Sequence, residues 1–420
     1  MNRQRVLLVA YPNSYRIGAY LRAAKALGVA VIVASPGKYS LVTAVAAGIH
    51  INLNDPHAVE QLLEVSQTMP FEGVIATDDA SVELASQIAH KLGLPGNSPK
   101  AAKISRRKDL SRACLLAASV PVPEFLLLNL RQPLQMQLAG LDYPVVIKPV
   151  SLSGSRGVIR VDNEADCLRA IARVETMLIG DTSIPEAEKQ SLLIEEYISG
   201  PELAIEGVLH KGEFQLLAIF DKPESMEGPF FVETYYVTPS RHSRQDQRLA
   251  VDSIAQACAA YGLTEGPVHA ECRLAEGKAW IMEVASRTIG GECARLLTHG
   301  TGQALETLVI EKCLGREVTI ETLSSGVGVM MLPITEAGIL RRVEGVLAAQ
   351  RVAGIDEILI SYREGYPLLP LPEGGSYLGF IFATAATPAE VEEALRAAYA
   401  KLNVVIAPVF QVSSSVAVEV

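Results

Sequence analysis

The sequence is poor in aromatic residues and carries no excess of positive charge. Aromatic side chains make up 5% of the 420 residues, and the formal net charge is −10 at pH 7. So few aromatics argue against a surface on which nucleic-acid bases stack. The negative charge argues against a nucleic acid or an anionic membrane as the partner. We therefore expect neither kind of partner.

Long apolar runs and paired cysteines are also missing. No stretch approaches the roughly 18 apolar residues of a membrane span, and the N-terminal run VLLVA is too short for the apolar segment of a signal peptide. The six cysteines are scattered without a CxxC pair, so we expect them to be reduced and mostly buried. Together these features predict a soluble cytoplasmic protein.

What is present suits a globular protein of several domains. Apolar residues make up 49% of the chain and charged residues 20%, which allows sizeable buried cores. Residues 5–34 read as strand, helix and strand, and residues 71–93 repeat the strand-then-helix pattern, as in a parallel sheet. The first turn, YPNSYRIG, lacks the G-x-G-x-x-G of a dinucleotide site. We predict a Rossmann-like domain that ends at the turn-rich segment 93–99.

Beyond that boundary the pattern mixes helices and strands. We predict helices over 101–118, 163–178 and 301–315, and strands over 214–221, 231–238, 266–275 and 279–285. From residue 316 onward another α+β pattern follows, with the apolar segments VGVMMLPI, EILISYREG and YLGFIFATA as strands and a final helix starting at PAEVEEAL.

The loop SLSGSRGV follows a strand that ends at Lys148 and Pro149. It does not match the Walker pattern, because no lysine follows its last glycine. A lysine before the loop suits a flap that folds over a triphosphate, with backbone N–H groups and serine hydroxyls as donors. A glycine-serine hairpin between two strands is the alternative interpretation.

Two glutamates lie on neighbouring predicted strands. Glu271 and Glu283 are separated by a short Glu-Gly-Lys turn, so a hairpin can place both carboxylates on one face. Such a pair needs a counter-ion, and hard oxygen ligands suit Mg²⁺, with Mn²⁺ as a substitute. Arg287 offers a forked donor for phosphate or carboxylate, and Gly290 and Gly291 can present N–H groups to an oxyanion. A charged surface hairpin remains the alternative.

Taken together, these motifs resemble those of ATP-grasp carboxylate–amine ligases, in particular the bacterial L-amino acid ligases. RRKDLSRACLLAASVPVPEF, VVIKP, SGSRGV and EEYISGPE occur in the family's order, and the resemblance covers nearly the whole chain. It implies an ATP-grasp fold of α/β and α+β type. The implied parts are a Rossmann-like pre-ATP-grasp domain (1–97), an ATP-grasp core (98–315) with a flap-bearing lid (about 120–192) and a metal and substrate subdomain (about 193–315), and a C-terminal α+β domain (316–420).

The resemblance also implies roles for individual residues. For ATP it implies phosphate contacts from Lys108, Lys148, Ser153, Gly154, Ser155 and Gly157, an adenine contact from Glu195, backbone contacts from Glu196 and Ile198, and a ribose contact from Glu202. It implies Glu271 and Glu283 as magnesium ligands, and Arg287, Gly290 and Gly291 as catalytic groups. For the substrate it implies Glu233 at an amino group, and Tyr236, Ile289, Gly291, Cys293 and Arg287 around it.

Some positions depart from the pattern or stay open. Ala285 replaces the asparagine that many ATP-grasp enzymes use as a further metal ligand, which puts a second Mg²⁺ in question. His269 is either a proton acceptor for the amine or a packed, hydrogen-bonded histidine. Tyr15 and Arg16, at the first turn, either bind substrate or cap a domain interface.

The implied reaction forms an acyl phosphate from ATP and a carboxylate, after which an amine displaces phosphate. We expect an amino acid as the carboxylate. The alternatives are a non-amino-acid carboxylate in natural-product or cofactor metabolism, and an ATP-binding sensor with little turnover. The expected partners are small-molecule substrates, with a homodimer possible by analogy.

Overall fold

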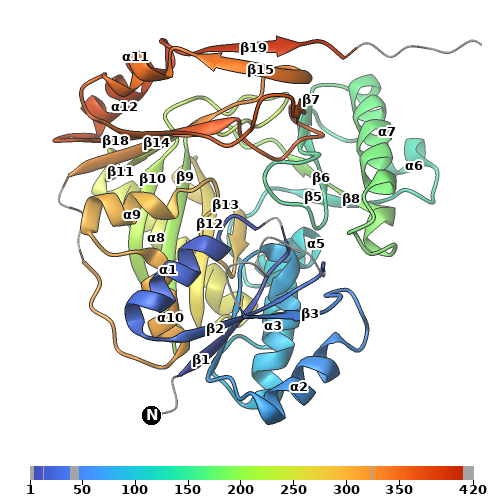
Figure 1. Ribbon diagram of the computed structural model, residues 1–420. Coiled ribbons are helices and arrows are strands. Elements are labelled where there is room, and N and C mark those ends of the chain that lie inside the picture. Colours follow the sequence, from blue (N-terminus) through green and yellow to red (C-terminus); the bar gives the residue numbers. More distant parts are fainter. Residues whose placement is uncertain (1–3, 13, 38–46, 322, 324, 410–420) are drawn as a thin grey trace, which may run out of the picture.

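The computed structural model describes residues 4–12, 14–37, 47–321, 323 and 325–409. The described part contains sheets of four, eight, three and four strands. In Figure 1 the N-terminal domain lies at the bottom, the lid on the right and the C-terminal segment on top, around a central sheet. This arrangement confirms the predicted ATP-grasp architecture of mixed helix and sheet.

The N-terminal domain is the predicted parallel sheet with covering helices. Its strand order is β3-β2-β1-β4. The elements are β1 (Arg5–Val9), α1 (Ile17–Leu27), β2 (Ala30–Ser35), β3 (Ala47–His50), α2 (Ala58–Thr68), β4 (Gly73–Ala76) and α3 (Asp79–Leu92). Helix α1 ends before Gly28, whose φ of +69° suits a glycine at this position.

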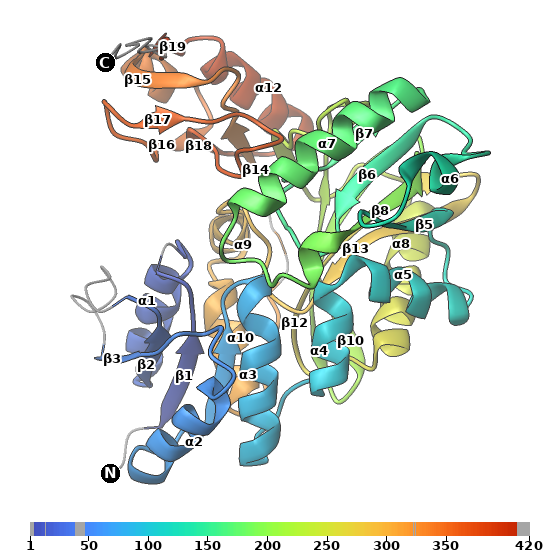
Figure 2. The same cartoon turned by 90° about the vertical axis from the view of Figure 1, so that its right-hand side faces the viewer.

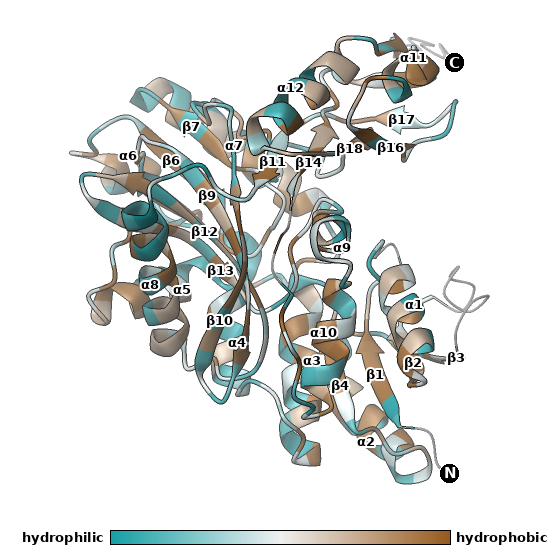
Figure 3. Ribbon diagram, turned by 90° about the vertical axis from the view of Figure 1, so that its left-hand side faces the viewer, coloured by the Kyte–Doolittle hydropathy of each residue, from teal (hydrophilic) through white to brown (hydrophobic). Residues whose placement is uncertain are grey.

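Alternate residues of β1 belong to two different cores. Leu7 and Val9 face a core inside the domain, whereas Val6 and Leu8 face a cluster that also contains Tyr236 of the central part. Figure 3 shows β1 and the nearby α10 (Leu305–Cys313) as strongly hydrophobic. The first strand therefore fixes the N-terminal domain against the rest of the molecule.

The helix predicted over 101–118 is two helices. The chain forms α4 (Pro99–Arg106) and α5 (Lys108–Ala117), and Arg107 between them has extended backbone angles. The N–H of Lys108 donates to the carbonyl of Val150 at 2.8 Å. The break therefore places Lys108 at the start of a helix, beside the glycine-rich loop.

The lid is a four-stranded antiparallel sheet with helices on its outer side. Its strand order is β5-β8-β6-β7. The elements are β5 (Phe125–Asn129), α6 (Leu134–Leu138), β6 (Val145–Pro149), β7 (Ile159–Val161), α7 (Glu164–Gly180), the 3-10 turn η2 (Glu188–Gln190) and β8 (Ser191–Glu196).

The central sheet has eight strands in the order β13-β12-β9-β10-β11-β14-β18-β16. Its first part comprises β9 (Glu202–His210), β10 (Glu213–Asp221), β11 (Tyr235–Thr238), α8 (Arg244–Tyr261), β12 (Gly266–Ala275), β13 (Lys278–Ala285), α9 (Ala294–Thr301) and α10. Strand β11 is shorter than the predicted 231–238. The helix predicted over 301–315 corresponds to α10, which begins at Leu305. Helix α9 precedes it, was not predicted, and ends before Gly302, which has a φ of +76°.

The C-terminal segment continues the central sheet and adds a small one. Strands β14 (Gly326–Leu332), β18 (Gly379–Ala385) and β16 (Ile355–Ile360) extend the large sheet, and the small sheet has the order β17-β15-β19. Its elements are β15 (Gly338–Glu344), α11 (Val346–Gln350), β17 (Pro367–Leu368), α12 (Pro388–Tyr399) and β19 (Asn403–Ala407). Figure 2 shows this segment above α9 and beside the lid. The central sheet thus includes strands from both sides of the predicted boundary at residue 315. The limits given above for the domains therefore remain predictions.

Within the described ranges, no helix combines the length and the apolar character that crossing a membrane would require.

Candidate active site

A cavity of about 720 Å³ lies where all parts of the molecule meet. The N-terminal domain contributes Asp79, the lid Lys148, the central sheet Glu271 and the C-terminal segment Tyr377. Most predicted site residues line it: Lys108, Lys148, Ser153, Gly154, Ser155, Glu195, Glu196, Ile198, Glu202, Glu233, Tyr236, Glu271, Glu283, Arg287, Gly290 and Gly291.

On the lid side, a buried carboxylate holds the second predicted lysine. Glu195 is 1% exposed and forms ion pairs with Lys148 and with Arg112, the latter at 2.6 Å. Burial raises the pKa of Glu195, but the charges of Arg112 and Lys148 outweigh burial and lower it to about 2. Because both carboxylate oxygens hold cations, the side chain of Glu195 positions Lys148, a role that the sequence analysis did not assign.

The first predicted lysine lies between the flap and a predicted metal ligand. The Nζ of Lys108 donates to the carbonyl oxygen of Leu152 at 2.7 Å and lies 3.6 Å from Glu283. In the flap, Gly154 and Ser155 both have positive φ, +64° and +55°. Such a left-handed pair can turn successive N–H groups toward an anion.

Gly157 was wrongly placed among the cavity residues. It is buried, and its N–H donates at 3.0 Å to the carbonyl of Pro372 in the C-terminal segment. A Cβ atom at this position would lie 2.7 Å from Pro149. Gly157 therefore allows the tight turn against Pro149 and bonds the flap to the C-terminal segment. In this conformation its N–H is not free for a phosphate.

The predicted glutamate hairpin is confirmed. Glu271 on β12 stands directly opposite Glu283 on β13 in an antiparallel register, so both side chains are on one face. The phenol of Tyr236 donates to Glu271 at 3.2 Å. Both carboxylates line the cavity.

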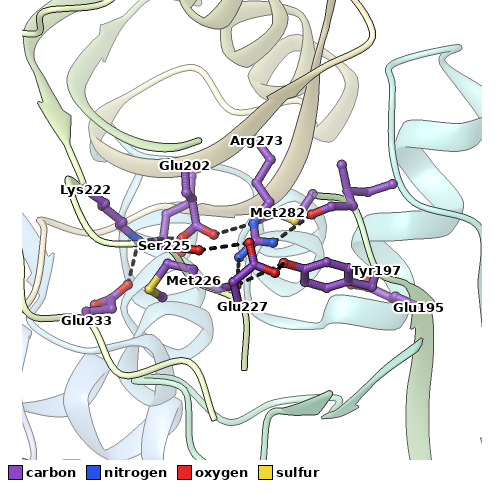
Figure 4. Close-up of polar contacts among 12 residues, drawn as sticks. Glu195, Tyr197, Glu202, Lys222, Ser225, Met226, Glu227, Glu233, Arg273 and Met282 are labelled. Atoms are coloured by element: carbon purple, nitrogen blue, oxygen red, sulfur yellow. Dashed lines mark hydrogen bonds and ion pairs between the residues drawn. The ribbon is translucent and has the colours of Figure 1, made fainter. Parts of the chain in front are cut away.

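A second carboxylate cluster surrounds Lys222, at the end of β10 (Figure 4). Its Nζ lies 2.6 Å from Glu202, 2.7 Å from Glu233 and 2.8 Å from Glu271. The other oxygen of Glu202 accepts from Arg273 at 2.8 Å. Glu202 was predicted to hold the ribose; in the structure it lines the cavity, and both of its oxygens pair with protein cations.

Carboxylate oxygens, the ligands that Mg²⁺ and Mn²⁺ prefer, gather on this wall of the cavity. Oxygen atoms of Glu202, Glu233 and Glu271 lie within 4.8 Å of one another, but the ammonium of Lys222 occupies the space among them. Glu283 is outside that group and faces Glu271 across the hairpin, and both line the cavity. The chemistry of this opposed pair fits the predicted magnesium ligands.

Charge in this cluster is unevenly distributed. Burial, together with the charge of Glu271, raises the pKa of Glu233 to about 7 despite the attraction of Lys222. Burial also acts on Glu271, but Lys222 and His269 outweigh it and lower the pKa of Glu271 well below its usual value. Glu233 is thus the carboxylate of the cluster that most needs a further cation.

His269 is held between two carboxylates. Its Nδ1 lies 3.4 Å from the buried Glu206 and its Nε2 3.7 Å from Glu271. Burial lowers the pKa of His269, but its interactions with these two carboxylates outweigh burial and raise the pKa to about 9. A protonated imidazole has no free lone pair, which argues against a proton acceptor at neutral pH and favours a packed histidine paired with carboxylates. The contact to Glu206 is an ion pair and not a hydrogen bond, since Nδ1 has no hydrogen-bond partner among the described residues.

The arginine predicted to be catalytic connects the central sheet to the N-terminal domain. Arg287 is 7% exposed and pairs with Asp79 at 2.9 Å, and its Nη1 donates to the carbonyl of Thr288. Gly290 and Gly291 follow on the cavity wall. Gly291 has a φ of +61°, and a Cβ there would lie 2.4 Å from the sulfur of Met331, so only glycine fits this turn.

Two residues predicted to shape the substrate pocket lie behind its wall. Ile289 is 2% exposed and Cys293 is fully buried, and neither lines the cavity. Both belong to the core cluster shared with the N-terminal domain. The prediction was wrong for both, because the turn at Gly290 and Gly291 faces the cavity while its neighbours face the core.

Several charged residues of the site were not predicted from sequence: Lys222, Arg112, Arg273, Asp78, Asp79 and Glu206. A signal existed for some of them. Lys222 follows the apolar strand LLAIFD, and Arg273 stands in an otherwise buried strand. A charge in such a context is rarely left unpaired.

Family comparisons agree with this architecture. Residues 21–96 match the ATP-grasp N-terminal domain, residues 141–295 the ATP-grasp domain, and residues 330–407 the L-amino acid ligase C-terminal domain 2. Among solved structures, an L-amino acid ligase from Bacillus licheniformis superimposes with a TM-score of 0.85 at 24% identity, covering 97% of this chain and all of that one. At that identity the likeness shows the fold.

Two further relatives have named products. Dapdiamide A synthase of Enterobacter agglomerans is 24% identical over 61% of this chain and 57% of its own length. Human carnosine synthase 1 is 24% identical over 53% of this chain and 28% of its own length. The chain therefore matches little more than half of the first enzyme and under a third of the second.

The domain matches define the class: residues 141–295 form an ATP-grasp domain, and residues 21–96 before it match the ATP-grasp N-terminal domain. Within that class the chain resembles the L-amino acid ligases, because the domain after the ATP-grasp core is of their type. The similarities support an ATP-dependent enzyme that joins a carboxylate to an amine.

Proposed function

We propose that the protein activates the carboxylate of an L-amino acid as an acyl phosphate and joins it to an amine, releasing ADP and phosphate. One observation carries this proposal. A single cavity brings together the two lysines, the flap, the opposed glutamates and the Gly290–Gly291 turn. These are the groups that a phosphoryl transfer followed by an acyl transfer requires.

In the first step a carboxylate oxygen of the substrate attacks the γ-phosphorus of ATP. A new O–P bond forms, and the bond to the leaving ADP oxygen breaks. Lys148, oriented by Glu195, and Lys108, beside the flap, neutralise phosphate oxygens. Glu271 and Glu283 would hold Mg²⁺, which when bound supplies further positive charge for the phosphates.

In the second step the amine attacks the acyl carbon. Negative charge develops on the carbonyl oxygen, where the N–H groups of Gly290 and Gly291 and the guanidinium of Arg287 can stabilise it. Phosphate then leaves with the electron pair of the C–O bond, and it can take up the proton that the amine nitrogen loses. The six cysteines form no part of this scheme, because no covalent enzyme intermediate is needed.

Glu233 supports an amino acid as the carboxylate substrate. It lies on the cavity wall near Glu271, and burial gives it a raised pKa of about 7. An α-ammonium group of the substrate would supply the missing positive charge. A carboxylic acid without an amino group would supply no positive charge, and the pKa of Glu233 would stay raised.

The test is ADP and phosphate release with Mg-ATP against amino acids, offered singly and in pairs, with mass spectrometry of the products. Release that depends on an amino acid, with a product heavier by one condensation, is the expected result. Tight ATP binding without release for any amino acid, but with release for another carboxylic acid, would overturn the substrate assignment.

A further inference from the structure

The first turn of the N-terminal domain forms a wall of the cavity that the proposed reaction has not used. Ser14, Tyr15 and Arg16 follow β1, at the carboxyl edge of the parallel sheet, and all three line the cavity. This edge is where open α/β sheets bind ligands. Arg16 is only 9% exposed although it faces the cavity.

Two buried donors of this turn lack a partner among the described residues. They are the Nε of Arg16 and the hydroxyl of Ser14. The other nitrogens of Arg16 are used, by Asp78 at 2.8 Å and by the carbonyl of Ile289 at 3.4 Å. Buried polar groups without a partner are uncommon and call for an explanation. A ligand with acceptor oxygens would provide one.

The helix that starts at this turn favours an anion. Helix α1 has no acidic residue in its first turn and no side-chain cap at its N-terminus. The N–H groups of Ile17 and Ala19 bond within the turn, to the carbonyl oxygens of Ser14 and Arg16, so the helix start contributes its dipole and no direct contact. The free donors of Arg16 and Ser14 supply the hydrogen bonds to a carboxylate.

The turn also lies at a suitable distance from the acyl group. The position that a Cβ would take at Gly290 is 3.4 Å from the Nη2 of Arg16 and 3.5 Å from the hydroxyl of Tyr15. The nitrogen of an α-amino acid lies about 2.5 Å from its carboxylate carbon. A carboxylate held at Arg16 therefore places the α-nitrogen beside the Gly290–Gly291 turn, where the acyl carbon has to be.

We propose that Arg16 and Ser14 bind the α-carboxylate of the amine substrate, so that the acceptor is an α-amino acid and not a simple amine. Asp78 neutralises one side of the guanidinium and orients it, and leaves the Nε free. The inference rests on the proposed function, because it requires an acyl phosphate at Gly290.

The test compares two acceptors with the same acyl donor. Hydroxylamine, a small amine without a carboxylate, captures acyl phosphates as hydroxamates, whereas an amino acid gives a dipeptide. In Arg16→Met the ratio of dipeptide to hydroxamate should fall about 10- to 100-fold, the contribution of a hydrogen bond to a charged group. Ser14→Ala should lower it less. Lys25→Met removes an exposed cation from the same helix and should leave the ratio unchanged.

The outcomes separate the two claims. An unchanged ratio in Arg16→Met and Ser14→Ala would overturn the acceptor site while leaving the ligase intact. If Arg16→Met fails to fold, the wild type decides: it should couple amino acids at least tenfold better than their amides, and equal use of both contradicts the inference. If the wild type yields no hydroxamate with any carboxylic acid, the proposed function fails, and the acceptor site fails with it.

Discussion

At the scale of single residues, the site depends on how buried carboxylates are paired. Three glutamates meet at Lys222, and their mutual repulsion would be costly without that ammonium. Glu195 is paired twice, with Arg112 and Lys148. Each of these glutamates is therefore paired with a cation, and breaking the pair should lower the stability or the activity of the protein.

Glu283→Gln should abolish ADP formation and leave the fold intact. The change keeps the shape of a partly exposed side chain and removes the charge that faces Glu271 and Lys108. We expect turnover to fall at least about 100-fold, as for the loss of a key electrostatic group, with an unchanged melting temperature. Glu276→Gln, in the exposed turn of the same hairpin, is the control. Full activity in Glu283→Gln contradicts the metal assignment.

Glu195→Gln should destabilise the protein in a manner that depends on pH. Because the pKa of Glu195 in the folded protein is about 2, its ionic contribution is present above pH 4.5 and is lost as the pH falls toward 2. At pH 7 we expect a loss of about 3–5 kcal/mol, typical of breaking a buried ion pair.

Urea unfolding at several pH values measures this loss. The difference between wild type and Glu195→Gln should shrink between pH 4.5 and the acid limit of the folded state. Glu124→Gln, an exposed glutamate that precedes β5, is the matched control and should show no such difference. A constant difference across this range would show that charge is not the cause.

At the scale of elements, the flap is held by the C-terminal segment. Besides the bond from Gly157 to Pro372, Arg173 of α7 pairs with Glu373 through two nitrogens, at 2.5 and 2.9 Å. Both side chains are partly exposed, 45% and 31%, so the pair contributes at most about 1 kcal/mol. Small as it is, this pair connects the lid to the loop that covers the cavity.

Glu373→Arg should raise the KM for ATP a few-fold, about twofold to fivefold by that estimate, and should increase proteolytic cleavage in the flap. The reversed pair, Arg173→Glu with Glu373→Arg, should restore both values, since the attraction is re-formed. The double variant is the control for non-specific damage. A failure of the reversed pair to recover would mean that the ion pair does not hold the flap.

The same scale shows what a sequence can and cannot predict. The β12–β13 hairpin was predictable, because two strand patterns with a short turn between them fix which residues stand opposite. The break between α4 and α5 was not, because a long-range bond from Lys108 to Val150 determines it. The cavity position of Lys148 was predictable from the strand and the loop that follows it, but the pairing of its partner Glu195 with Arg112, on α5, was not.

At the scale of the whole molecule, the cavity exists only when distant parts of the chain assemble. Residues 361, 362, 375–377 and 380 of the C-terminal segment line it together with the N-terminal turn and the lid. The central sheet connects the C-terminal segment to the part of the chain before it, because β14 pairs with β11 and β18 pairs with β14. The segment after 315 therefore completes the sheet of the catalytic core.

A chain ending at residue 315 should not fold cooperatively. It would expose the edge of β11 and the side chains that pack on β14 and β18. Near-ultraviolet circular dichroism and thermal unfolding should show lost tertiary packing, and supplying residues 316–420 as a separate chain should restore part of it. A cooperative transition with ATP binding in the shortened chain would instead establish residue 315 as a true domain limit.

The central claim is that the carboxylate of one substrate is phosphorylated by ATP before the amine reacts. Transfer of an oxygen label tests it most directly: an amino acid with ¹⁸O in its carboxylate is converted with Mg-ATP and an amine, and the released phosphate is weighed by mass spectrometry. An acyl phosphate predicts one ¹⁸O atom in each phosphate released with ADP. Unlabelled phosphate, or label found in AMP, would contradict the account.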